Sequence, residues 1–213
     1  MNEQVRPEAV LLLHGLWMNS VAMLYLALAL DAAGFAAESV NYHSMRGTLA
    51  EHVEALAERI ASTPAKVVHL VAHSLGGIVV LDYLQRARRD ERIGRVVLLG
   101  APVGGSQAAR AFADWPGGDL MLGRSIDIWR SGHRPQLDAA ISVAAIAGSS
   151  PFGLGSMFMD VPDPSDGVVT VQETRLPGLA DHLVLPVSHS GMLISQEVAR
   201  QTAAFLRHGR FER

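Results

Sequence analysis

A serine lies between a strand-like segment and a helix-like segment at residues 72–76, which read AHSLG. Residues 66–71 before it are rich in β-branched and aliphatic side chains, and residues 77–88 after it have a helical pattern. The small residues two positions on either side of Ser74 allow a sharp turn, in which the serine takes a strained positive φ and its hydroxyl projects from the corner. This arrangement predicts a nucleophile for covalent catalysis.

A serine hydroxyl is a weak nucleophile at neutral pH, so a histidine must take its proton and a carboxylate must orient that histidine. His189 follows the last predicted strand, residues 183–187, and we therefore expect it at the same sheet edge as Ser74. His182 precedes that strand, which predicts a surface position at the opposite edge. His189 is the predicted general base.

The carboxylate that orients the histidine is predicted to be Asp166. It follows the predicted strand 142–148 and precedes Gly167 in a turn, where local backbone donors can fix one oxygen while the other meets the histidine. Asp163 and Asp160 are the alternatives, and any of the three aspartates could instead serve only to form a turn.

The oxyanion of an acyl-transfer intermediate needs two donors already in place. The backbone N–H of Leu75, at the start of the helix after Ser74, is the first predicted donor. The second is the N–H of Leu16, in the turn after the first strand, where Gly15 lets the chain bend; Trp17 is the alternative. Both donors belong to the backbone, so the prediction is geometric and does not depend on side-chain type.

Apolar segments and helical patterns alternate along the chain and predict an α/β fold. The expected architecture is a mostly parallel, doubly wound sheet of about six strands with helices on both faces. No composition shift marks a second domain, so residues 1–213 are expected to form one domain. The predicted strands are 9–13, 37–42, 66–72, 94–100, 142–148 and 183–187, and the clearest helices are 20–33, 48–62 and 192–206.

The order Ser74, Asp166, His189, with His14 and Gly15 upstream, resembles the α/β-hydrolase superfamily, in particular its small bacterial lipases and esterases. The resemblance runs from about residue 9 to 206 and includes LGAPVGGS at 99–106, SDGVV at 165–169 and SHSGM at 188–192. It implies a structural role for His14 in the oxyanion turn. Only eight residues precede the first predicted strand, so the two leading antiparallel strands of larger members are expected to be missing. The chain leaves no room for a large cap domain, and we therefore expect a minimal version of the fold.

The resemblance implies an enzyme that hydrolyses small-molecule carboxylic esters. Trp17, Met18 and Met121 are predicted to contact the substrate, which we expect to carry a short or medium acyl chain. Region 101–140, which contains Met121, either walls the acyl pocket or packs as a satellite core. An acyltransferase or thioesterase using the same triad is the alternative, and a non-catalytic binding module is a third possibility.

Composition excludes several other functions. A net charge of −3 gives no footprint for nucleic acid or anionic membranes, and the absence of cysteine excludes thiolate chemistry. His43 and His133 lack a compact metal-ligand spacing, and no glycine pattern predicts a phosphate-bearing cofactor, so neither metal nor cofactor is expected. The longest apolar run, 21–30, is too short to span a bilayer, and the polar start predicts a cytoplasmic protein.

Overall fold

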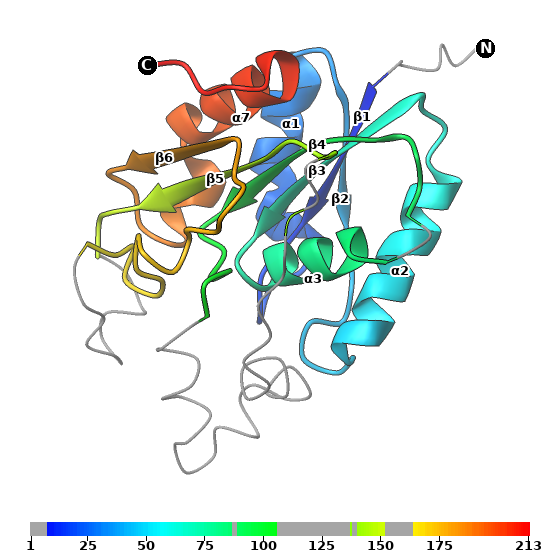
Figure 1. Ribbon diagram of the computed structural model, residues 1–213, viewed down its shortest axis with the longest axis horizontal. Helices are drawn as coiled ribbons and strands as arrows, with labels where there is room; N and C mark the ends of the chain where they lie inside the picture. Colours follow the sequence, from blue (N-terminus) through cyan, green and yellow to red (C-terminus); the bar gives the residue numbers. More distant parts are fainter. Residues whose placement is uncertain (1–7, 87–88, 106–136, 138–139, 152–163) are drawn as a thin grey trace.

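The computed structural model describes residues 8–86, 89–105, 137, 140–151 and 164–213. Six strands form one sheet in the order β2-β1-β3-β4-β5-β6, and every neighbouring pair is parallel (Figure 1). All six predicted strands are therefore confirmed. They are β1 (Glu8–Leu13), β2 (Ala36–Val40), β3 (Val67–His73), β4 (Ile93–Leu99), β5 (Val143–Gly148) and β6 (Asp181–Leu185).

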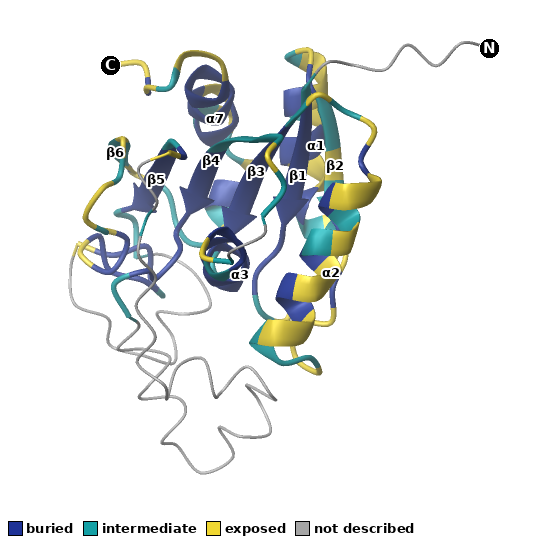
Figure 2. Cartoon of the chain, turned by 45° about the vertical axis from the view of Figure 1, so that its right-hand side comes forward, coloured by how far each residue is buried: buried dark blue, intermediate teal, exposed yellow. Residues whose placement is uncertain are grey.

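Helices cover both faces of the sheet, as the alternation of elements predicts (Figure 2). Side chains of a strand alternate between faces, so Val10 and Leu12 of β1 pack in the core under α1 (Leu24–Ala32) and α7 (Gln196–His208). Their neighbours Leu11 and Leu13 pack under α2 (Leu49–Ser62) and α3 (Leu75–Leu84). The sheet is thus buried between two helical layers, so polar side chains of its inner strands can reach solvent only at the strand ends.

Local signals place the ends of several helices. The Thr48 side chain accepts from the backbone N–H of Glu51, and the Glu51 carboxylate accepts from the Thr48 backbone, which is the predicted capping box at the start of α2. The last predicted helix is interrupted, because a 3₁₀ turn, η4 (Gly191–Ile194), ends at Ile194 and the next residue, Ser195, caps α7. A further 3₁₀ turn, η1 (Ser20–Met23), precedes α1.

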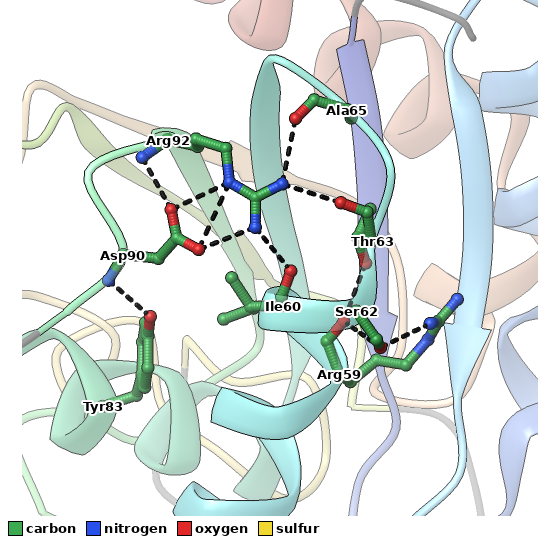
Figure 3. A network of polar contacts seen from close by, with 8 residues as sticks. All are labelled: Arg59, Ile60, Ser62, Thr63, Ala65, Tyr83, Asp90 and Arg92. Carbon is green, nitrogen blue, oxygen red and sulfur yellow. Dashed lines mark hydrogen bonds and ion pairs between the residues drawn. The ribbon is translucent and has the colours of Figure 1, made fainter.

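One arginine closes the carboxyl end of α2 (Figure 3). The Arg92 guanidinium donates to the carbonyl oxygens of Ile60, Thr63 and Ala65 at 2.8, 2.7 and 3.0 Å. The same group pairs with the Asp90 carboxylate at 2.7 Å, which lowers the pKa of Asp90 below its usual value. Helix-end carbonyls have no partner within their own helix, so Arg92 satisfies groups that would otherwise need water.

The edge at which the strands begin carries the last residues of the chain. Phe211 donates its N–H to the carboxylate of Asp181, the first residue of β6, at 2.9 Å, and Arg213 pairs with the same carboxylate. Lys66, the single lysine of the chain, is exposed directly before β3 begins. The opposite edge, where the strands end, is left for the predicted site.

Candidate active site

Ser74 occupies the sharp turn between β3 and α3 that the sequence predicts. Its backbone has φ 53° and ψ −121°, a conformation that L-residues avoid. The Ser74 N–H donates to the carbonyl of Leu99 at 3.0 Å, which ties the turn to the end of β4. A Cβ on Gly76 would stand 2.7 Å from the carbonyl oxygen of His14, so this position requires glycine. The serine side chain itself stays partly exposed.

Asp166 and His189 form a hydrogen-bonded pair. Asp166 Oδ2 lies 2.7 Å from His189 Nδ1, and the His189 N–H donates to the carbonyl of Asp166 at 2.9 Å. Asp166 Oδ1 accepts from the backbone N–H groups of Val168 and Val169 at 2.9 and 2.7 Å. A carboxylate oxygen accepts, so His189 Nδ1 is the donor in this contact. The side chain of His189 is 12% exposed and that of Asp166 is 1% exposed.

A close approach at the end of β4 holds this pair against the sheet. A Cβ on Gly100 would stand 2.9 Å from Asp166 Oδ2 and 3.1 Å from His189 Nδ1, and Gly100 has φ 53°. Ser74, Asp166 and His189 follow β3, β5 and β6, so all three lie beyond carboxyl ends of the sheet. Gly100 belongs to the LGAPVGGS motif at 99–106, and no local pattern in that motif indicates its contact with Asp166 and His189.

The turn after β1 lies against the serine. A Cβ on Gly15 would stand 3.0 Å from the Cβ of Ser74, and the following residues Leu16 and Trp17 form the turn, with Trp17 at φ 60°. Leu75 is the first residue of α3, where backbone N–H groups have no partner within the helix. Both predicted oxyanion donors thus belong to segments that flank Ser74, and their role stays a prediction.

Tyr42 supports this turn, although no local pattern in the sequence indicates it. Its hydroxyl donates to the carbonyl of His14 at 2.7 Å, and its ring stacks on the His14 ring at 4.4 Å between centroids. His14 Nδ1 lies 2.8 Å from the carbonyl oxygen of Gly15. Burial lowers the pKa of His14 and raises that of Tyr42, so both rings stay neutral near pH 7. These contacts fix the chain direction immediately before Leu16.

One of the remaining predictions, that His182 precedes the last strand, is wrong, and several others concern residues outside the described part of the chain. His182 does not precede the last strand but is its second residue, where its Nε2 lies 2.9 Å from Thr174 Oγ1. The strand starts earlier than the apolar pattern indicates, because pairing of Asp181 with Ala144 extends it. Trp17 is 55% exposed, and Met18 is partly buried against the core cluster that contains Val10 and Leu12. Met121, Asp160, Asp163, His133 and most of 101–140 lie outside the described residues.

The described residues contain neither a candidate metal centre nor a candidate membrane-spanning helix. No group of three or more histidine, aspartate or glutamate side chains in the described ranges is placed to hold a metal ion. Within the same ranges, no helix combines the length and the apolar character needed to cross a bilayer.

Comparisons with known proteins agree with the fold. The model of the Alpha/beta hydrolase family matches residues 10–211. The Bacillus licheniformis lipase BlEst2 in its mature form superposes with a TM-score of 0.72 at 20% identity, covering 99% of this chain and 95% of the lipase. The propeptide form of that lipase is longer, and the chain spans 52% of it.

Two further solved structures illustrate the range of proteins with this fold. The metagenomic carboxyl esterase MGS0156 has a TM-score of 0.68 at 18% identity, covering 88% of this chain and 65% of the esterase. The Bottromycin epimerase BotH has a TM-score of 0.60 at 19% identity, covering 94% and 91%. A search of curated protein sequences found no significant match.

Proposed function

Because the chain belongs to the alpha/beta hydrolase family, we propose that it is a serine hydrolase that cleaves small carboxylic esters through an acyl-enzyme. The observation that carries the proposal is the 2.7 Å contact between Asp166 and His189 at the strand ends beside the strained Ser74. Packing of the core alone does not require an aspartate–histidine contact, a strained serine and their common position at the strand ends. Nucleophilic catalysis requires all three. The lipase and esterase names of two similar structures favour esters over other acyl substrates.

In the proposed mechanism, Ser74 Oγ attacks the ester carbonyl carbon while His189 Nε2 takes the hydroxyl proton. Asp166 holds the imidazole in the tautomer that leaves Nε2 free and stabilises the imidazolium that forms. The backbone N–H groups of Leu16 and Leu75 donate to the oxyanion. His189 then returns the proton to the leaving alcohol, and water repeats the sequence on the acyl-enzyme to release the acid.

The acceptor of the acyl group distinguishes the proposed hydrolase from an acyltransferase on the same triad, because only the hydrolase gives the acyl-enzyme to water. The epimerase among the similar structures illustrates that this fold also carries other chemistry. Supplying alcohol acceptors and measuring the transfer-to-hydrolysis ratio separates the two. Dominant transfer at low acceptor concentration would replace the esterase proposal.

A fluorophosphonate probe tests the nucleophile. We expect the wild-type protein to form an adduct on Ser74, located by peptide mass spectrometry, and Ser74→Ala to form none. A series of nitrophenyl esters then measures acyl length, with short and medium chains expected to turn over fastest. A folded wild-type protein that forms no adduct and cleaves no ester would favour the binding module over the enzyme.

A further inference from the structure

His73 precedes the proposed nucleophile and contacts the proposed base. Its Nε2 lies 3.0 Å from the backbone carbonyl oxygen of His189, and the two imidazole rings stand 4.5 Å apart between centroids. A carbonyl oxygen only accepts, so His73 Nε2 is the donor and carries the ring proton. The His189 backbone is thereby held at both groups, because its N–H already donates to Asp166.

The other side of the His73 ring faces the oxyanion turn. His73 Nδ1 stands 3.0 Å from the point that a Cβ on Gly15 would occupy, and this buried nitrogen has no hydrogen-bond partner among the described residues. The ring is fully buried. The His73 side chain therefore fills the space between the turn after β1 and the loop after β6. His73 is also the neighbour of Ser74 in the chain.

We propose that His73 is a positioning residue: its Nε2–H bond to the His189 carbonyl sets the distance between the imidazole and the hydroxyl of Ser74. The inference rests on the proposed function, since it gives His189 and Ser74 their roles. His73 is the last residue of β3 and directly precedes Ser74 in the chain. A shift of the His189 loop would therefore have to break or stretch a hydrogen bond to the strand that carries the serine. Misplacement of reacting groups by about 1 Å costs on the order of 100-fold in rate.

The surroundings of His73 Nδ1 favour the neutral form of the ring. A second proton on Nδ1 would lie buried beside Gly15 without an acceptor among the described residues. Burial first, and then the charges of His189 and His14, hold the pKa of His73 well below its usual value. His73 therefore stays neutral near pH 7 and donates from Nε2.

Two substitutions separate the hydrogen bond from the ring packing. His73→Phe keeps an aromatic ring but removes the donor, and we expect kcat to fall roughly 10- to 100-fold with KM changed less than about 2-fold. In His73→Gln the side-chain amide nitrogen reaches about as far as Nε2, and we expect kcat within about 3-fold of the wild type. Each rate is divided by the number of active sites titrated with a fluorophosphonate, so unfolded protein does not contribute.

His69→Phe is the matched control. His69 is also a buried histidine of β3, and its Nδ1 accepts a backbone N–H, that of Arg95, at 2.9 Å. Its loss should lower the unfolding temperature without changing kcat per titrated site. A reactive wild type whose His73→Phe variant keeps full kcat, or whose His73→Gln variant is as slow as His73→Phe, overturns the positioning role alone. An unreactive wild-type Ser74 refutes the proposed function as well.

A measurement on the wild-type protein decides the point even if both variants fail to fold. Long-range ¹⁵N–¹H spectra of the imidazoles report the tautomer of His73. We expect the neutral Nε2–H form at pH 6.5 and below. A neutral His73 that carries its proton on Nδ1 overturns the inference, because Nε2 could then not donate to the His189 carbonyl.

Discussion

Two residues other than glycine have a positive φ in the described part of the chain, Ser74 and Trp17. Both lie at the edge where the strands end, in the two turns that flank the proposed oxyanion position. Such backbone conformations cost about 1–3 kcal/mol each and persist only where the surrounding structure imposes them. The strain is therefore concentrated where the proposed chemistry takes place, and substitution can measure it.

Ser74→Gly and Ser74→Ala both remove the proposed nucleophile, but only glycine relieves the positive φ. We expect both variants to lack esterase activity and the glycine variant to be more stable than the alanine variant by about 1 kcal/mol. Urea unfolding with equal m-values measures the difference. An alanine variant as stable as the glycine variant would mean that the turn stores no strain at this residue.

At the residue scale, the sequence predicts a position when a local pattern and a strand end coincide. Ser74 has small residues at fixed spacing, Asp166 precedes a glycine turn and His189 follows an apolar strand, and the structure brings the last two into contact. Tyr42 and the positive φ of Trp17 could not be predicted. Tyr42 contacts His14 across 28 positions, and tryptophan has no preference for the left-handed region.

At the scale of elements, Arg92 joins the end of α2 to the start of β4 through three carbonyls and the carboxylate of Asp90 (Figure 3). Each hydrogen bond contributes about 1 kcal/mol net, and an unmet carbonyl costs more. A lysine could form only part of this network, because it lacks the planar fork of donors. The connection between α2 and β3 therefore depends on one side chain that comes from a later segment.

Replacing Arg92 by lysine should lower the free energy of unfolding by about 2 kcal/mol. Arg86→Lys is the control, since Arg86 pairs with Glu54 at 2.7 Å on the exposed surface, and its loss should cost less than about 0.5 kcal/mol. Chemical unfolding of the two variants beside the wild type measures both values. Equal destabilisation would show that the α2 carbonyls find other partners.

Elements were predictable from hydrophobic patterning, but some of their ends were not. The apolar pattern of residues 192–206 fits one continuous helix, because Met192 and Leu193 are buried in η4 as they would be in α7. The interruption at Ser195 follows from its side chain, which accepts from the Val198 N–H and starts a new helix. The early start of β6 depends on pairing with β5, which single-strand hydrophobicity does not encode.

At the scale of the whole molecule, buried histidines make the free energy of unfolding sensitive to acid. Burial lowers the pKa of five of them, which come from different parts of the fold: His14, His52, His69, His73 and His182. The unfolded chain binds protons at these groups near pH 6.5, while the folded chain does not. Their stabilising effect is thus complete above pH 6.5 and declines as the pH falls toward the folded values.

We expect the free energy of unfolding to fall between pH 6.5 and 5, a window above the range in which most carboxylates titrate. Each histidine contributes up to about 1.4 kcal/mol per pH unit. His52→Gln should reduce this slope, because it removes one buried imidazole. Urea titrations at several pH values measure the slope, and a flat curve would contradict the burial of these groups.

Lys66 offers a single attachment point for amine-directed chemistry on a side chain. It stands before β3, and Ser74 stands after the same strand, about 25 Å away at the spacing of extended chain. Anchoring the protein to a solid support through this amine would orient the proposed active site toward the liquid. Turnover per immobilised molecule should equal that of the free protein. A loss of turnover after selective biotinylation of Lys66 would show that modification at the start of β3 affects the site at its end.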